Sequence, residues 1–131
     1  MNLLPVVRAF ACVAVALATP AAMAAPPGPV SYGQLGFAPC TLSQPGQAQT
    51  VPARCAVLPV PENRSSPKGR RIELSIAWVP STAKQPAADP VVLLAGGPGQ
   101  SAQQAFPSTY PAFRDILKQR PVLLIDQRGT G

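Results

Sequence analysis

The sequence predicts an α/β fold that starts with an antiparallel strand pair and continues into a parallel sheet. Residues 70–79 alternate apolar and polar side chains with a period of two, which is typical of a strand with one buried face. Two short apolar runs, residues 91–95 and 122–125, lack this alternation, as strands of a parallel sheet do when both their faces are buried. The 26 residues between these runs are enough for a crossover connection.

The antiparallel pair is expected between residues 54–61 and the strand at 70–79. Pro59 and Pro61 interrupt the first of these segments, which predicts a short edge strand, because proline is tolerated at sheet edges. The Ser-, Pro- and Gly-rich residues 63–69 predict the turn that joins the two strands.

Residues 111–118 predict a short helix inside the crossover. Pro111 suits its first turn, and the apolar side chains of the segment fall on one face. Residues 25–53 are rich in Pro, Gly and Gln and show no period, so we expect a flexible segment there. The domain proper is expected to cover residues 54–131.

The first 24 residues have the order of a secretory signal peptide. Arg8 precedes an apolar run over residues 9–18, and Ala22-Met23-Ala24 forms a cleavage site of small residues. The run is about ten residues long, whereas a membrane-spanning helix needs roughly 20. We therefore expect cleavage after Ala24 and export through the secretory machinery to the periplasm or the extracellular space.

Two of the three cysteines remain after that cleavage. Cys12 lies in the leader, whereas Cys40 and Cys55 belong to the mature chain. Cysteines of an exported protein usually pair, so a disulfide is favoured over two free thiols. A zinc site has little support, because the chain has no histidine and offers only two thiols. No metal or cofactor is implied.

The formal net charge is +6, but the charges are scattered along the chain. One cluster stands out, in and beside the predicted turn: Arg64, Lys68, Arg70 and Arg71. A solvated hairpin is the commoner role of such a cluster, and a binding patch is the alternative. Aromatic residues are only 5 % of the chain, which argues against nucleic acid as a partner.

Two loops that follow the buried strands carry the candidate chemistry. The first is Ala95-Gly96-Gly97-Pro98-Gly99-Gln100-Ser101, and the second is Asp126-Gln127-Arg128-Gly129-Thr130-Gly131. Open α/β sheets place their sites at these strand ends. One interpretation is dinucleotide binding, because residues 97–102 match G-x-G-x-x-A and Asp126 ends the next strand. Pro107 and Pro111 argue against it, since the fingerprint requires a helix to open at the glycines.

The other interpretation is acyl transfer. Glycines let backbone N–H groups approach a carbonyl oxygen and stabilise the oxyanion that develops on it, and one such donor is worth about 3 kcal/mol of barrier. In α/β-hydrolases one donor comes from the loop after this early strand and another from the residue after the nucleophilic serine.

The two motifs together resemble the proline iminopeptidase family and its secreted tripeptidyl-aminopeptidase-like relatives. Gly96-Gly97-Pro98-Gly99 follows an apolar strand, and Asp126-Gln127-Arg128-Gly129 follows the next one. Residues 55–62 and the strand at 70–79 look like the first strands of the exported relatives, so the resemblance covers residues 37–131. It implies the N-terminal portion of an α/β-hydrolase fold, without a cofactor, acting on peptides or small amides and esters.

The resemblance also assigns roles to individual residues. The Gly97 N–H would be an oxyanion-hole donor, with Gly96 and Gly99 shaping the loop, or these glycines form only a structural turn. Asp126 and Arg128 would hold the loop beside the site rather than act in catalysis. Many family members have a histidine before the two glycines, where this chain has Ala95.

The 131 residues lack the rest of such a machinery. They contain no histidine and no G-x-S-x-G nucleophile elbow, so no Ser-His-Asp triad can form among them, and Ser101 is expected to be a loop residue. We therefore expect an incomplete α/β-hydrolase fold that is inactive alone, from a parent enzyme that works through an acyl-enzyme. A non-catalytic exported binding module with one disulfide is the alternative.

Overall fold

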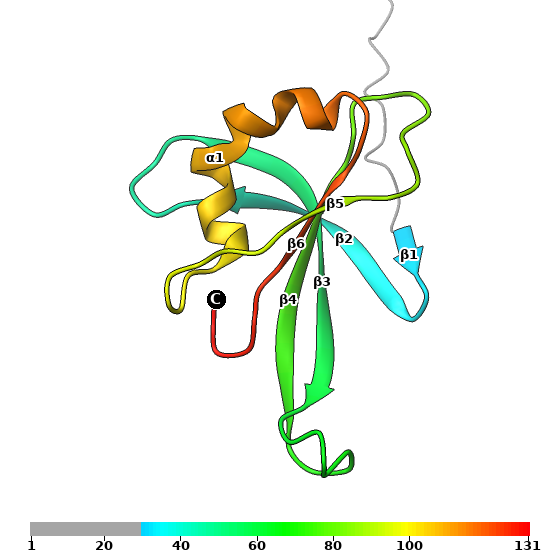
Figure 1. Cartoon of the computed structure of the whole chain (residues 1–131), viewed down its shortest axis with the longest axis vertical. Coiled ribbons are helices and arrows are strands. Elements are labelled where there is room, and N and C mark those ends of the chain that lie inside the picture. Colours follow the sequence, from blue (N-terminus) through cyan, green and yellow to red (C-terminus); the bar gives the residue numbers. More distant parts are fainter. Residues whose placement is uncertain (1–29) are drawn as a thin grey trace, which may run out of the picture.

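The computed structural model describes residues 30–131, which form one mixed sheet with a helix on one of its faces (Figure 1). The predicted signal peptide lies outside the described residues. The elements in chain order are β1 (Val30–Tyr32), β2 (Leu35–Ser43), β3 (Thr50–Pro61), β4 (Arg71–Val79), β5 (Val91–Leu93), α1 (Ala102–Leu117) and β6 (Val122–Ile125). The strand order across the sheet is β1-β2-β3-β4-β6-β5.

The predicted antiparallel pair is confirmed, and its first strand is longer than expected. β3 runs for 12 residues and pairs with β4 from Arg54 opposite Trp78 to Pro61 opposite Arg71. On its other side β3 pairs with β2 only between Thr50 and Cys55. Beyond Cys55 the strand has a neighbour on one side only, which is why prolines fit there.

The predicted parallel unit is also confirmed. β5 and β6 pair in parallel, with Val91 opposite Val122, and α1 lies between them in the sequence. The expected burial of both faces is wrong for the first strand: Val92 is 50 % exposed and Leu94 is 57 % exposed. β5 is the last strand of the sheet within residues 30–131, and only its other face packs under α1.

The expectation of a flexible segment over residues 25–53 is wrong for most of its described part. Strand β2 and the first four residues of β3 lie within it, paired from Ala38 opposite Cys55 to Ser43 opposite Thr50. Three apolar side chains anchor these strands in the interior: Phe37, Leu42 and Val51. The surrounding Gly, Pro and Gln residues, most of them exposed, hid this pattern.

The helix is twice as long as predicted and contains both prolines. It begins at Ala102 rather than at residue 111, with Pro107 and Pro111 in its interior. Each proline removes one backbone donor. Separately, the hydroxyls of Ser108 and Thr109 donate to the carbonyl oxygens of Ala105 and Phe106, at 2.7 and 3.1 Å. Figure 1 shows the axis of α1 changing direction along its length, as expected of a proline-containing helix.

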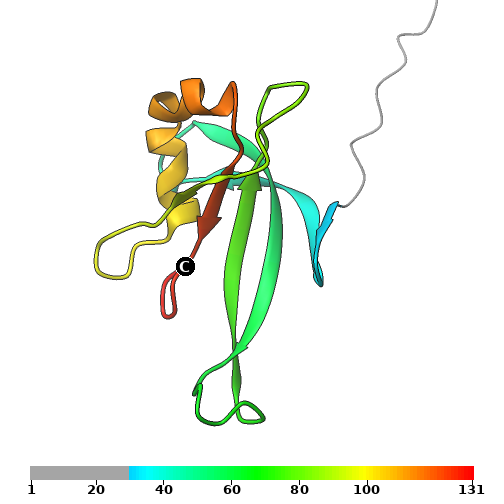
Figure 2. The same cartoon turned by 45° about the vertical axis from the view of Figure 1, so that its right-hand side comes forward.

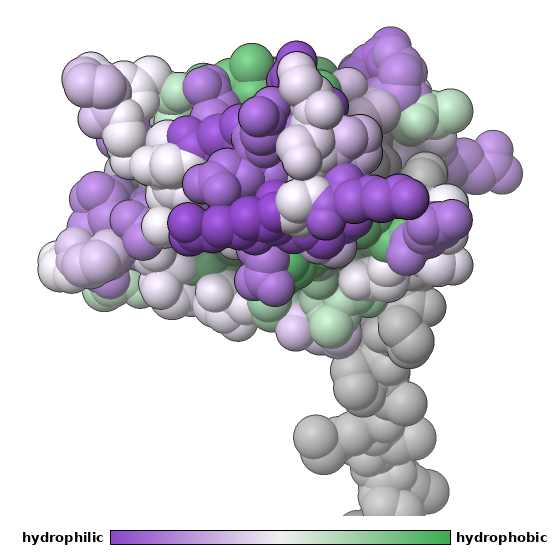
Figure 3. Space-filling view, turned by 90° about the horizontal axis from the view of Figure 1, so that it is seen from below, coloured by the Kyte–Doolittle hydropathy of each residue, from purple (hydrophilic) through white to green (hydrophobic). Residues whose placement is uncertain are grey.

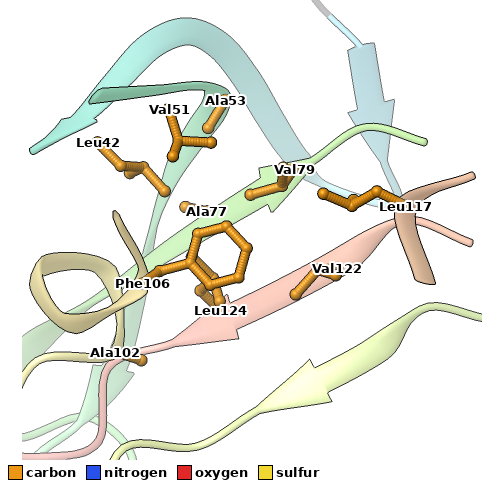
Figure 4. Close-up of a cluster of buried hydrophobic side chains, with 10 residues drawn as sticks. All are labelled: Leu42, Val51, Ala53, Ala77, Val79, Ala102, Phe106, Leu117, Val122 and Leu124. Carbon is orange, nitrogen blue, oxygen red and sulfur yellow. The ribbon is translucent and has the colours of Figure 1, made fainter. Parts of the chain in front are cut away.

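The main core lies between α1 and the sheet (Figure 4). Phe106 is fully buried there against the sheet side chains and forms edge-to-face contacts with Tyr110 and Phe113, at centroid distances of 5.9 and 5.3 Å. The core residues are Leu42, Val51, Ala53, Ala77, Val79, Ala102, Phe106, Leu117, Val122 and Leu124. They come from β2, β3, β4, β6 and α1, so the helix holds four strands together.

The opposite face of the sheet bears a second, smaller apolar cluster. Ile76 and Trp78 alternate along β4 with the residues that face α1, and Leu123 does the same along β6. A pocket of about 220 Å³ opens on this face, lined by Leu35, Phe37, Ile76, Trp78, Ala88, Pro90 and Leu123. No helix of residues 30–131 is long and apolar enough to cross a lipid bilayer.

A disulfide joins β2 to β3. Cys40 and Cys55 are 15 residues apart in sequence, and their Cα atoms are separated by 5.8 Å. In the pairing of these strands each cysteine lies two positions from its partner, since Cys40 is opposite Ala53 and Cys55 is opposite Ala38. The disulfide therefore links the two strands of the β2–β3 hairpin diagonally across the pairs of their hydrogen-bonded ladder.

We expect the double substitution Cys40→Ser and Cys55→Ser to lower the free energy of unfolding by about 3 kcal/mol. The reason is that a closed loop of this length restricts the unfolded chain. Urea unfolding followed by circular dichroism measures the effect, and reduction of the unmodified protein should shift its midpoint similarly. An unchanged midpoint in both experiments would show that the ladder alone holds the hairpin.

Candidate functional site

The two loops singled out in the sequence lie at one edge of the sheet. Because β5 and β6 are parallel neighbours, their carboxyl ends lead out on the same side. The glycine loop follows β5 and runs into α1, and the loop of residues 126–131 follows β6. This is the edge at which open α/β sheets place ligands.

Gly97 occupies a backbone conformation that requires glycine. Its φ angle is +145°, and the Gly97–Pro98 peptide bond is cis. A Cβ atom at this position would lie 2.9 Å from the backbone nitrogens of both Gly99 and Gln100. By contrast, a Cβ on Gly96 would meet no atom within 4 Å. Of the two adjacent glycines, only Gly97 lacks the space for a larger residue.

The glycine loop is open to solvent. Residues 96–100 are all exposed, and the hydrogen bonds within residues 30–131 include none from the N–H of Gly97. An exposed donor without an internal acceptor can bind an oxygen atom of a ligand. The assignment of the Gly97 N–H as an oxyanion-hole donor stays a prediction.

Asp126 is buried and caps the start of α1. Its side chain is 3 % exposed. One carboxylate oxygen accepts a hydrogen bond from the Ala102 N–H at 2.7 Å, and the other accepts one from the Ser101 hydroxyl at 2.9 Å. The first turn of α1 has no acidic residue of its own, so Asp126, which directly follows β6, supplies the negative charge that favours a helix N-terminus.

Ser101 is the N-cap of α1. It is 4 % exposed, and its hydroxyl oxygen accepts a hydrogen bond from the Gln104 N–H at 3.2 Å while donating to Asp126. The sequence interpretation treated Ser101 as a loop residue and missed this role. The signal was present, because Ser101-Ala-Gln-Gln104 has the spacing S-x-x-Q of a capping box.

The cap weakens the dinucleotide interpretation for a reason that the sequence did not reveal. The argument that prolines prevent a helix after the glycines was wrong, since α1 opens at Ala102. However, Asp126 accepts from the N–H groups of Ala102 and Gln103, at 2.7 and 3.4 Å. A carboxylate thus occupies the place where a pyrophosphate would bind, and it is not available for a ribose.

Arg128 connects the loop of residues 126–131 to the turn end of the β3–β4 hairpin. One guanidinium nitrogen donates to the carbonyl oxygens of Pro61 and Glu62, at 2.9 and 2.8 Å. The backbone N–H of Asp126 also donates to the Ser75 carbonyl at 3.0 Å. The loop of residues 126–131 is therefore held at two points of the adjacent strand pair, the middle of β4 and the end of β3. Residues 30–131 contain no cluster of His, Cys, Asp or Glu that could hold a metal ion.

No protein-family model matches the chain. It is similar to Carboxylesterase B from two strains of Mycobacterium tuberculosis, CDC 1551 and H37Rv, with 31 % identity over 114 residues. A Mycobacterium bovis protein that is named only as a hydrolase has the same identity over the same number of residues. The alignment covers 86 % of this chain and 22 % of each relative, so the chain spans about a fifth of their length. The chain thus has hydrolase relatives.

We expect Gly97→Ala to disturb the loop and Gly96→Ala to leave it unchanged. The first substitution forces a Cβ into two backbone nitrogens at an unfavourable φ, whereas the second meets open space. Amide chemical shifts of residues 96–101 measure the difference by NMR. Equal shifts for both variants would contradict the loop geometry described here.

We expect Asp126→Asn to lower the free energy of unfolding by about 1–3 kcal/mol. The amide would turn an NH2 group toward buried hydrogen-bond donors and would remove the negative charge at α1. Asp115→Asn is the matched control, because Asp115 is an exposed helix residue that pairs only with Lys118, and it should change little. Chemical denaturation of both variants tests this, and equal midpoints would argue against a structural carboxylate.

Proposed function

We propose that the chain forms the first part of a secreted serine hydrolase of the α/β-hydrolase type. The observation that carries this proposal is the exposed glycine loop, with the N–H of Gly97 free of internal acceptors, at the carboxyl end of a parallel strand. The hydrolase relatives and the strand order β4-β6-β5, with α1 as the crossover, support the same conclusion.

The glycine loop would stabilise the oxyanion of an acyl-transfer reaction. When a nucleophile attacks a carbonyl carbon, negative charge develops on the carbonyl oxygen, and the Gly97 N–H would donate to it. A fixed donor of this kind contributes about 3 kcal/mol to lowering the barrier. Gly99, at φ +85°, and Gly96 would shape the turn, and Asp126 would keep α1 and both loops in register.

The nucleophile and its base would come from residues beyond these 131, since the chain has no histidine. The free edge of β5 is the place where a further parallel strand would pair, and a serine at the carboxyl end of that strand would face the glycine loop. The exposed side chains of Val92 and Leu94 would then be covered. On this proposal the 131 residues alone do not turn over substrate.

The substrate we propose is an N-terminal peptide bond, as in the proline iminopeptidase and tripeptidyl-aminopeptidase type. The Gly96–Gly99 and Asp126–Gly129 motifs support this class. The relatives named Carboxylesterase B favour a simple ester instead. The acyl-enzyme chemistry is the same in both, and only the leaving group differs, an amine or an alcohol.

The test begins with the DNA downstream of the Gly131 codon. We expect an open frame that encodes a G-x-S-x-G elbow and later an aspartate and a histidine. The product of that frame should hydrolyse aminoacyl anilides as well as the matched esters, and Gly97→Ala should lower kcat by about 100-fold, because the clash of its Cβ displaces the oxyanion donor. Gly96→Ala should retain most of the activity.

Two results would count against the proposal. A stop codon directly after Gly131 would leave no triad and would favour a non-catalytic binding module. A full-length enzyme that hydrolyses only esters would keep the hydrolase mechanism but overturn the aminopeptidase class.

A further inference from the structure

A group of basic residues at the end of the β3–β4 hairpin has no part in the proposed reaction. Residues 62–71, here called the basic hairpin, hold four cations and one acid, all exposed to solvent: Arg64, Lys68, Arg70, Arg71 and Glu62. Strands β3 and β4, which carry the basic hairpin, extend beyond the rest of the sheet (Figures 1 and 2). Seen from that end, hydrophilic side chains cover the middle of the molecule (Figure 3).

The basic hairpin is held in one shape by its own hydrogen bonds. The Asn63 side chain accepts from the Ser65 N–H at 2.9 Å, and the Asn63 carbonyl accepts from the Ser66 N–H at 3.0 Å. The Gly69 N–H donates to the Ser66 carbonyl at 2.9 Å. A preformed projection loses less conformational entropy on binding than a mobile loop does.

The positive charge of the basic hairpin is largely uncompensated. Its one acidic contact joins Arg70 to Glu62 at 3.7 Å, with both side chains solvated, so the pair is weak. Arg71 donates to the Pro59 carbonyl, which leaves its charge in place. Within residues 30–131, Arg64 and Lys68 form no ion pair.

The arrangement of these cations indicates which anion they fit. Arg70 directly precedes β4 and pairs with Glu62 through its carbonyl, and Arg71 is the first residue of β4. Consecutive residues of paired extended backbone point to opposite faces, whereas a pocket for one phosphate needs donors that converge. Residues 62–71 contain no aromatic side chain on which a nucleic-acid base could stack. Just behind the cations, Val60 and Ile72 form a half-buried apolar cross-strand pair.

We propose that the basic hairpin docks the protein on an anionic phospholipid surface. Such a surface presents many phosphates in a plane, which suits cations spread along a projection, with apolar side chains at its base. The hairpin projects from the same end of the sheet as the glycine loop, because β4 runs antiparallel to β6 and begins at Arg71, five residues before the Ile76 that lies opposite Ile125 at the end of β6. Docking would therefore turn the candidate site toward the lipid.

The test is sedimentation of the full chain with lipid vesicles. We expect binding to phosphatidylglycerol–phosphatidylcholine vesicles to exceed binding to phosphatidylcholine alone. It should weaken strongly between about 0.1 M and about 1 M salt, as the Debye length falls from about 10 Å to about 3 Å. The neutral vesicles report any contribution of the apolar leader, which is the same in all variants.

Two sets of substitutions distinguish the contribution of the hairpin cations to lipid binding from the contribution of the net charge of the protein. The triple substitution Arg64→Gln, Lys68→Gln, Arg70→Gln should weaken binding by about 100-fold, at roughly fivefold for each cation near an anionic surface. Lys84→Gln, Arg114→Gln, Lys118→Gln is the matched control, because it removes three exposed cations elsewhere and should change binding much less. All the substituted side chains are exposed, and circular dichroism verifies that both variants fold.

Three outcomes would overturn the proposal. The first is equal binding of the two triple variants, which would reduce the effect to net charge. The second is binding to neutral vesicles as strong as binding to anionic ones. The third is tighter binding of the unmodified chain to a short DNA duplex than to anionic vesicles, which would identify nucleic acid as the partner. The proposed hydrolase function stands or falls separately, since none of these variants touches the glycine loop.

Discussion

The buried carboxylate of Asp126 is the contact on which the arrangement of the site depends. It directly follows β6 and accepts hydrogen bonds from the Ala102 N–H and the Ser101 hydroxyl, so one side chain connects the end of a strand, a helix and the end of the glycine loop. Burial of a charge is unfavourable unless hydrogen bonds compensate for it, and here the helix amides and two side chains do so. This one compensated charge holds the end of the glycine loop, at Ser101, beside the end of β6.

Much of the fold could be predicted from the sequence where one physical rule dominates. The period-two pattern of β4 gave both its limits and its antiparallel partner, and the two unpatterned apolar runs were recognisable as parallel strands. The prediction failed where tertiary contacts override local preference. Phe37, Leu42 and Val51 anchor strands in a segment whose Pro, Gly and Gln residues suggest a loop, and Phe106 secures a helix despite its two prolines.

The candidate site was predictable in its position but not in its contacts. Two glycine-containing loops after neighbouring parallel strands must meet at one sheet edge, and the sequence was enough to see this. The family resemblance predicted a structural role for Asp126, but its hydrogen bonds to the start of α1 could not be predicted from the motif, because G-x-G-x-x-A followed by an acid after the next strand is compatible with a ligand-facing or a helix-facing side chain. Which arrangement forms depends on the direction of the Asp126 side chain, and local sequence does not encode that direction.

The strand order has a consequence for how the chain reaches its final shape. β6 follows β4 and β5 in the chain yet lies between them in the sheet. β5 has no other neighbour in the sheet of residues 30–131, so it stays unpaired until β6 has been synthesised and inserted. Arg128 then fastens to carbonyls 66 and 67 residues earlier in the chain. Contacts of such sequence separation form slowly, so the β4-β6-β5 arrangement closes only after the whole α1 crossover is in place.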